Sequence, residues 1–317
     1  MSSRKRKGMR QLLGAPPTEV DTRVPQRLLH GKGSYRLLRM IGSGSYGEVF
    51  LAERQDDARQ RFAIKCVTKA DCKEDALKRF VAECSFLRRL DHPNILRYVE
   101  DIETPSHHFL VTELSKSGDL LGRINAFGKL SESKAKNLFR QLVAALQHAH
   151  SEGIVHRDFK LENILIVGDD TVKLADWGFA MTWCPGHMHT QALGSQQYAA
   201  PELWARRPYL GPELDCWSLG VVLYAMVAGT LPFYKSTASD EDTKETILKC
   251  EYRMPNHLST SCSNLIHGLL WLDQRTRMKL SDVVHHPWFL PTLLTSPDNN
   301  NASSPMEGPV DDRVSQK

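Results

Sequence analysis

The stretch HRDFKLENILIVGDDTVKLADWG, residues 156–178, brings two carboxylates, a lysine and an amide into one short part of the chain. The Asp158 carboxylate can accept a proton from an attacking hydroxyl, and the Lys160 ammonium can neutralise a phosphoryl group during its transfer. Asn163 and Asp176 offer the oxygen ligands that Mg²⁺ prefers. Each residue alone could be an ordinary surface side chain, but the set predicts a phosphoryl-transfer site.

A glycine-rich segment lies upstream, in GSGSYGEV at residues 42–49. Gly42, Gly44 and Gly47 form the pattern G-x-G-x-x-G, which a helix would follow in a dinucleotide-binding fold. Here EVFLAE alternates like a strand, so we expect the glycines at the tip of a hairpin. Their backbone N–H groups could then approach phosphate oxygens closely. A plain structural turn is the alternative.

A lysine follows in the apolar run FAIK, which ends at Lys65. An ammonium in a partly buried strand needs a counter-charge or a bound anion, because an unpaired charge there is costly. The candidate is Glu83, on a helix expected over Asp75 to Leu90; the alternative is a glutamate that faces solvent. We expect this helix to bury an apolar stripe of Leu77, Phe80, Val81, Cys84 and Leu87.

The composition is that of an ordinary globular protein, with 41% hydrophobic and 25% charged residues among 317. The formal net charge of +4 is too small to indicate a nucleic-acid or membrane surface. The seven cysteines show no CxxC spacing, which favours a reducing compartment. The longest apolar stretch, residues 216–229, is shorter than the roughly 20 residues that a membrane span needs. We expect a cytoplasmic protein, with the nucleus as the alternative because of the RKRK run at residues 4–7.

Secondary-structure patterns divide the chain into two parts of different kind. Residues 35–113 contain five short strand-like runs and one helix, whereas helical periods dominate after residue 120. Segments 1–32 and 291–317 are polar and lack apolar periodicity, and we expect them to be disordered tails, the first of them basic. The pattern predicts an α+β fold with a small β-rich lobe and a larger helical lobe.

In this order and spacing the motifs resemble those of eukaryotic protein kinases over about residues 35–290. The matching motifs are GSGSYGEV, AIK, Glu83, HPNI, HRDFKLEN, DWG, YAAPE, DCWSLG and RMKLSDVVHHPWF. The runs GSQQYAAPELW and CWSLGVVLYAMVAGTLPF are most similar to the calcium/calmodulin-dependent and AMP-activated kinase group. The resemblance implies a kinase domain at residues 33–290, with an N-lobe at 33–113, a hinge at 114–118 and a C-lobe at 119–290.

The resemblance also implies a site for ATP and Mg²⁺ between the lobes. Lys65, held by Glu83, is expected to grip the α- and β-phosphates. The reacting end is expected to contain Asp158 and Lys160, with Asn163 and Asp176 on the metal. ATP-contacting positions are implied at Ile41, Gly42, Gly44, Gly47, Val49, Ala63, Lys65, Thr112, Glu113 and Leu165. The resemblance further implies a Glu202–Arg277 pair and a stack of Leu87, Tyr98, His156 and Trp177 that links the lobes.

Two positions depart from the usual pattern or are candidates for regulation. Trp177 stands where the family usually has Phe, and we expect it to be accommodated; a bias in the orientation of the Asp176 loop is the alternative. Arg157 precedes the catalytic aspartate, and such kinases bury this arginine against an anion. No Asp or Glu occurs between Asp176 and Glu202, so phosphorylated Thr190 could supply the charge, with Thr182 as the rival.

Residues around the catalytic motif indicate the class of substrate. Lys160 together with Ser195 is similar to serine/threonine rather than tyrosine kinases. Asp119 and Glu162 are acidic where several kinases bind an arginine three residues before the target hydroxyl. The resemblance therefore implies a protein substrate with basic residues before its target.

The partners expected are that protein substrate and an upstream activating kinase, without nucleic acid or membrane. The alternative of a different class is a pseudokinase scaffold, which binds partners and transfers nothing. Pseudokinases usually lack one of Lys65, Asp158 and Asp176, and all three are present.

Overall fold

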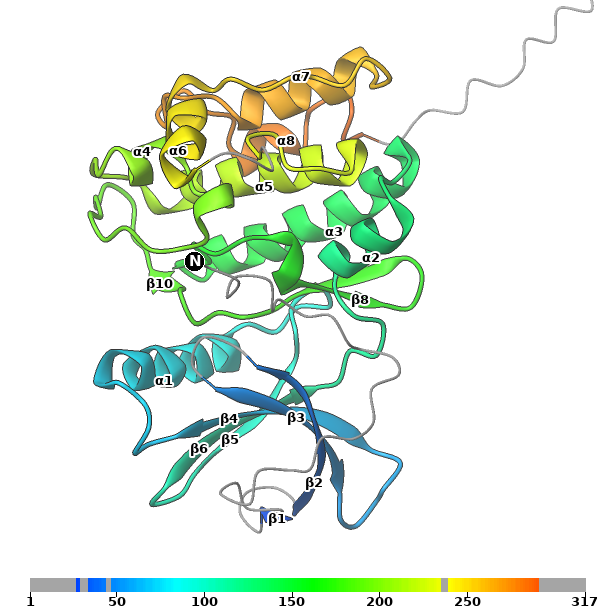
Figure 1. Ribbon diagram of the computed structural model, residues 1–317, viewed down its shortest axis with the longest axis vertical. Helices are drawn as coiled ribbons and strands as arrows, with labels where there is room; N and C mark the ends of the chain where they lie inside the picture. Colours follow the sequence, from blue (N-terminus) through cyan, green and yellow to red (C-terminus); the bar gives the residue numbers. More distant parts are fainter. Residues whose placement is uncertain (1–26, 29–33, 44–46, 235–238, 291–317) are drawn as a thin grey trace, which may run out of the picture.

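The computed structural model describes residues 27–28, 34–43, 47–234 and 239–290, which form two lobes (Figure 1). The predicted α+β, two-lobed fold is confirmed. Outside the described residues lie Gly44, the RKRK run, the tail expected at 291–317 and all of the tail expected at 1–32 except Arg27 and Leu28.

One antiparallel sheet forms the smaller lobe, at the bottom of Figure 1, with the strand order β1-β2-β3-β4-β6-β5. On β4, Phe62, Ile64 and Cys66 are buried in the core of the sheet, whereas Ala63 and Lys65 lie on the opposite side. This alternation, which is the ordinary period of a strand, aims Lys65 at the space between the lobes. The strands are β1 (Arg27–Leu28), β2 (Tyr35–Ser43), β3 (Glu48–Arg54), β4 (Arg61–Thr68), β5 (Tyr98–Glu103) and β6 (His107–Glu113).

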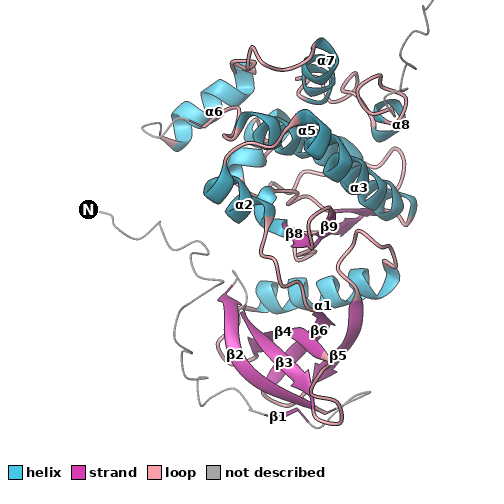
Figure 2. Ribbon diagram, turned by 90° about the vertical axis from the view of Figure 1, so that its right-hand side faces the viewer, coloured by secondary structure: helices cyan, strands magenta, loops and turns pink. Residues whose placement is uncertain are grey.

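Helix α1 (Glu74–Arg89) lies between the sheet and the larger lobe (Figure 2). Phe80, Cys84 and Leu87 are buried as expected. The expected burial of Val81 is wrong, because its side chain is 49% exposed. Glu83 is buried instead, with 3% exposure. Steps of about 100° per residue place Glu83 beside Phe80 and Leu87 and turn Val81 away from them.

The larger lobe is mainly helical and is built around α5, which is buried over nearly its whole length. Helices α3 and α7 pack on it, and Gly229 ends it in the left-handed conformation, with φ of 78°. Among the described residues, no helix is both long enough and apolar enough to cross a membrane. The helices are α2 (Leu120–Phe127), α3 (Glu132–Ser151), α4 (Pro201–Trp204), α5 (Gly211–Ala228), α6 (Asp240–Lys249), α7 (Thr260–Leu269) and α8 (Leu280–Val283).

Two short antiparallel pairs support the segment between residues 154 and 182. Strand β7 (Ile154–Val155) pairs with β10 (Met181–Thr182), and β8 (Ile164–Val167) pairs with β9 (Thr171–Leu174). The loops that carry the predicted catalytic residues therefore begin and end on paired strands.

Candidate active site

A cavity of about 370 Å³ lies between the two lobes, which is within the usual size range for a small-molecule site. Lys65 and Glu83 line it from the smaller lobe, and Lys160, Asn163 and Asp176 line it from the larger one. Of the other positions expected to contact ATP, those in the lining are Ile41, Gly42, Val49, Ala63, Thr112, Glu113 and Leu165.

The glycine segment forms the predicted hairpin. Strands β2 and β3 are antiparallel, with Gly42 opposite Val49 and Ser43 opposite Glu48. A side chain at Gly47 would place its Cβ 2.2 Å from the Cys66 carbonyl oxygen, so only glycine fits there. The structure thus assigns Gly47 a packing role against β4.

Lys65 forms a buried charge cluster with two carboxylates. Its Nζ donates to Glu83 Oε2 at 2.7 Å and to Asp176 Oδ1 at 3.3 Å. The Glu83 carboxylate also accepts a hydrogen bond from the backbone N–H of Trp177. Burial alone would lower the pKa of Lys65, but the two carboxylates raise it above its ordinary value. Burial alone would raise the pKa of Asp176, but the Lys65 and Lys160 ammonium groups hold it below its ordinary value. The cluster therefore presents a permanent ammonium and an ionised aspartate to the cavity.

Asp158 is buried and held through both carboxylate oxygens. Oδ1 accepts from the Ser195 backbone N–H at 2.9 Å, and Oδ2 accepts from Lys160 Nζ at 2.6 Å. Lys160 also donates to Ser195 Oγ at 2.8 Å. Asn163 Nδ2 donates to the Asp158 carbonyl at 2.9 Å, which leaves the amide oxygen of Asn163 as a ligand atom. Asp158, Lys160, Asn163 and Ser195 are thus brought together by the fold.

The residues in the cavity fit a hydrated Mg²⁺ ion. Asn163 contributes an amide oxygen and Asp176 an ionised carboxylate to the lining of the same cavity. Two protein ligands are enough for Mg²⁺ when phosphate oxygens and water supply its other ligands. Within the described residues, no group of three or more His, Cys, Asp or Glu side chains is placed to hold a metal by itself.

A buried aspartate that had no expected role anchors the loop of residues 156–163, which carries Asp158 and Lys160. Asp215, on α5, accepts from the backbone N–H groups of His156 and Arg157, each at 2.9 Å, and forms a 2.8 Å hydrogen bond with His150 Nε2. These bonds hold Arg157 at a φ of 62°, in the left-handed region that is unfavourable for a non-glycine residue. The sequence signal was present, because a carboxylate inside an apolar helix must find partners.

His156 and Trp177 form the centre of the predicted stack. Their ring centroids lie 4.6 Å apart, and both side chains are fully buried. His156 Nε2 donates to the Ala175 carbonyl at 3.1 Å, and its Nδ1 accepts from the Asp158 backbone N–H at 3.2 Å. Both nitrogens of a neutral imidazole are thereby used. Trp177 is accommodated, but its indole N–H has no hydrogen-bond partner among the described residues.

We expect the stability of the protein to fall as the pH decreases below about 6.5. Burial lowers the pKa of His156 below its ordinary value, so in this range the unfolded chain binds a proton that the folded chain does not. One such proton is worth about 1.4 kcal/mol per pH unit. Urea unfolding measured from about pH 7.5 to 5.5 should show this decrease in the free energy of unfolding. In His156→Phe the slope against pH should be smaller by the contribution of about one proton.

A matched control is His285→Phe, because this side chain is exposed. Equal slopes in the wild type and in His156→Phe would contradict the assignment. Other histidines whose pKa is lowered by burial contribute to the wild-type slope in the same direction, namely His92, His107, His108, His189 and His286.

The Arg157 guanidinium, expected to meet an anion, has neutral partners. It donates to the Phe179 carbonyl at 2.7 Å, and to Gln191 Oε1 and the Tyr209 hydroxyl at 3.3 Å each. Thr190 is exposed and directly precedes Gln191, whereas Thr182 is exposed on β10. The guanidinium therefore lies beside the Thr190 segment without a counter-charge from a described residue.

The two acidic residues expected to bind substrate lie in different surroundings. Asp119 is buried and caps α2, where Oδ1 accepts from the Gly122 backbone N–H at 2.7 Å. Burial raises the pKa of Asp119 above its ordinary value. Glu162 is half-buried and accepts from the Tyr198 hydroxyl at 3.2 Å. Glu162 is therefore the more accessible carboxylate.

A contact that the sequence did not predict joins the end of β6, in the smaller lobe, to the larger lobe. Glu113 accepts from Lys173 Nζ on β9 and from the Arg97 backbone N–H, each at 2.7 Å. No local pattern marks this pair, because its members lie on strands of different lobes.

Comparisons with known proteins agree with this geometry. The family model described as "Protein kinase domain" matches residues 35–289. The serine/threonine-protein kinase SIK1 of Rattus norvegicus is 36% identical over 268 residues, which cover 84% of this chain and 34% of the rat protein. The SNF1-related protein kinase catalytic subunit alpha KIN12 of Arabidopsis thaliana is 38% identical over 271 residues, covering 83% of this chain and 53% of the plant protein. The matched region thus spans between a third and about half of these curated relatives.

Proposed function

The chain belongs to the family of protein kinase domains, and we propose that it transfers the γ-phosphoryl group of ATP to serine or threonine hydroxyls of proteins. The observation that carries the proposal is the meeting of Lys65, Asp158 and Asp176 around one site. Lys160 connects Asp158 with the other two residues, because it donates a hydrogen bond to Asp158 and lines the same cavity as Lys65 and Asp176. The serine/threonine class is supported by the name of the rat relative, a serine/threonine-protein kinase.

The charges of the cavity suit a bound triphosphate. The Lys65 ammonium supplies a fixed positive charge for phosphate oxygens. Asp176 and Asn163 would hold Mg²⁺, which when bound neutralises charge on the phosphates. Apolar side chains from both lobes, among them Val49 and Leu165, would enclose the adenine.

Asp158 is placed to position the substrate alcohol. Because Ser195 and Lys160 fix both carboxylate oxygens, the carboxylate can orient a hydroxyl and take up its proton. The hydroxyl oxygen forms a bond to the γ-phosphorus while the bond to the β-phosphate oxygen breaks, which leaves ADP. Lys160 stabilises the negative charge of the group in transfer.

A direct test uses the full chain with Mg²⁺, ATP and a serine peptide that contains arginines before the serine. Mass spectrometry should detect phosphoserine, and the amount should increase linearly with enzyme. If the chain binds ATP tightly and transfers nothing to any peptide of a positional library, it is a pseudokinase scaffold and the proposal is wrong.

We expect phosphorylation of Thr190 to raise activity by about tenfold or more. A phosphate there would replace neutral partners of Arg157 with charge-assisted hydrogen bonds and order the segment next to Ser195. Phosphate mapping of active protein and the kcat of Thr190→Ala and Thr182→Ala test this. Adding Gln191→Glu to Thr190→Ala should restore part of the rate, because the new carboxylate would face Arg157. Full activity of an unphosphorylated chain would contradict this prediction. It would also show that no upstream activating kinase is needed.

We expect arginine three residues before the target to raise kcat/KM by about fivefold over alanine, the effect of one partly exposed ion pair. Glu162→Gln should remove most of this preference, since its carboxylate is the accessible one. Asp119→Asn should change it little, because Asp119 is committed to the α2 cap. Paired arginine and alanine peptides measure the effect, and an unchanged ratio in Glu162→Gln would exclude this role.

A further inference from the structure

Helix α1 carries Glu83 into the cavity between the lobes, and Arg79 lies one turn earlier on the same helix. Residues four positions apart lie on one face of a helix, so both side chains are directed toward the larger lobe. The Cζ atom of Arg79 lies 5.5 Å from the centroid of the Phe179 ring. This is within the distance of about 6 Å at which a cation and an aromatic ring attract each other. Arg79 therefore connects α1 with the segment that follows Asp176.

Phe179 has a defined place in the larger lobe. Its carbonyl oxygen accepts a hydrogen bond from Arg157 Nε at 2.7 Å. The chain turns just before it, in a turn closed by the hydrogen bond from the Ala180 N–H to the Trp177 carbonyl at 3.0 Å. In the same turn, the backbone N–H of Trp177 donates to the Glu83 carboxylate. A side chain that binds the Phe179 ring is therefore held close to this contact with Glu83.

The Arg79 guanidinium is oriented by its own helix. Its Nε donates to the Asp75 carbonyl, one turn earlier, at 3.2 Å. A planar guanidinium is better suited than an ammonium group to lie on an aromatic ring. Arg79 and Phe179 are both half-buried, so water screens their contact only in part.

Two arginines attach α1 to the larger lobe, one on each side of Glu83. Near the end of the helix, Arg89 donates to the Glu152 carbonyl. At its start, the N-cap residue Lys73 makes no side-chain hydrogen bond to the helix. With a rise of about 1.5 Å per residue, Glu83 lies about 6 Å along the axis from Arg79 and about 9 Å from Arg89. Arg79 is the nearer of the two attachments, and its loss would let the first turns of α1 move together with Glu83.

We propose that Arg79 is a positioning residue for phosphoryl transfer, which acts through Glu83. Its guanidinium holds α1 against Phe179, and this places the Glu83 carboxylate where it pairs with Lys65. The Lys65 ammonium is then in position for the phosphates of ATP. Arg79 itself does not line the cavity between the lobes. This inference rests on the proposed kinase function and adds a residue outside the cavity on which the rate depends.

The first test is single-turnover phosphorylation of the serine peptide by Arg79→Gln, which keeps an aliphatic stem and removes the charge. At saturating ATP and peptide, the rate constant should fall about fivefold, the usual effect of losing one half-exposed cation–π contact. Phe179→Leu removes the aromatic face, and adding Arg79→Gln to it should lower the rate no further. If the two effects multiply in the double variant, the side chains act independently and the proposal is wrong.

A second pair of variants tests whether Arg79 acts through Glu83. The rate of Glu83→Gln is already reduced, and adding Arg79→Gln should have no further effect on it. A residue that acts independently of Glu83 would lower the rate by the same factor in both backgrounds. An equal factor in wild type and in Glu83→Gln would therefore overturn the proposal.

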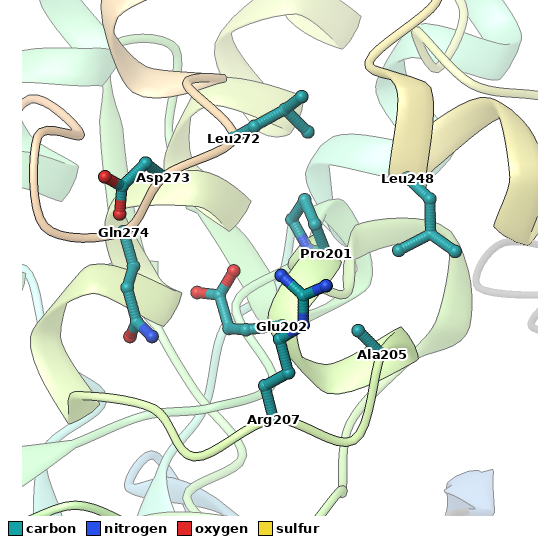
Figure 3. A pocket seen from close by; sticks show the side chains of 8 residues that line it. All are labelled: Pro201, Glu202, Ala205, Arg207, Leu248, Leu272, Asp273 and Gln274. Atoms are coloured by element: carbon teal, nitrogen blue, oxygen red, sulfur yellow. The ribbon is translucent and has the colours of Figure 1, made fainter.

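Two variants control for the loss of a positive charge as such. Lys78→Gln removes the adjacent exposed lysine, whose ion pair with Glu74 lies on the surface of α1. Arg207→Gln removes an exposed arginine that lines a cavity of about 480 Å³ in the larger lobe (Figure 3). The residues around that cavity come from α4, α6 and the loops after α4 and α7, and none comes from α1. Both variants should keep the wild-type rate, and a fivefold loss in both would refute a specific role of Arg79.

Hydrogen exchange of the full chain without ATP, followed by mass spectrometry, separates this inference from the proposed function. In Arg79→Gln, the fragment that contains Trp177 should exchange about fivefold faster, because its N–H donates to Glu83 and would be released more often. Fragments of α5 should exchange as in the wild type, since only a global loss of stability would accelerate them. Both control variants should leave the Trp177 fragment unchanged.

Faster exchange of the Trp177 fragment without a change in α5 supports the positioning role even if no peptide is phosphorylated. Unchanged exchange of the Trp177 fragment refutes it, and so does an equal acceleration in α5. In either of those cases, phosphorylation of the peptide by the wild type would leave the kinase function intact.

Discussion

Replacing Asp158 with asparagine should slow phosphoryl transfer by about 10²–10⁴-fold, the usual effect of losing a positioned base. The amide oxygen can still accept from the Ser195 backbone N–H. The amide nitrogen, however, would face the Lys160 ammonium, which now donates to Oδ2 at 2.6 Å. Two hydrogen-bond donors, the amide NH₂ and the Lys160 ammonium, would then face each other without an acceptor between them. Asp158→Asn therefore loses both the proton acceptor and the hydrogen bond that orients Lys160.

A single-turnover measurement with saturating ATP and peptide isolates the step that is affected. ATP affinity, measured by equilibrium binding, should change little, because Asp158 does not line the cavity between the lobes. Asp169→Asn is a matched control, since Asp169 is an exposed aspartate that follows β8. A near-normal rate for Asp158→Asn would remove the assignment of Asp158 and weaken the kinase proposal.

Replacing Arg277 with methionine should reduce the free energy of unfolding by about 3–5 kcal/mol, the usual effect of breaking a buried ion pair. The guanidinium is almost fully buried and donates to Glu202 at 2.7 and 2.9 Å. It also donates to the carbonyl oxygens of Trp271 and Glu213, each at 2.8 Å. Methionine fills similar volume but leaves the Glu202 carboxylate buried without a counter-charge.

Urea unfolding of the full chain measures this loss, and Arg275→Met, on an exposed neighbour, is the control. Replacing both partners, Arg277→Met with Glu202→Leu, should recover part of the stability, because no charge then remains buried. A loss below about 1 kcal/mol in Arg277→Met would show that water reaches Glu202, and it would contradict the assignment of a buried ion pair.

The order of the main elements could be predicted from local sequence. The alternation of apolar and polar residues in EVFLAE was enough to predict the β2–β3 hairpin. The helical spacing of Phe80, Cys84 and Leu87 was enough to predict α1. The same periodicity failed at Val81 and Glu83, because an amphipathic pattern does not say how wide the buried face is. That width depends on what packs against the helix, here the Lys65 ammonium and the backbone of Trp177.

Motif spacing predicts that Lys65, Asp158 and Asp176 take part in phosphoryl transfer, because few types of side chain can accept a proton or bind phosphate or Mg²⁺. The packing of distant segments settled their surroundings. It joined Asp215 to the loop of residues 156–163, committed Asp119 to the α2 cap, and gave Arg157 neutral partners in place of an anion. These features rest on contacts between residues far apart in the chain, and no local pattern of residues encodes such contacts.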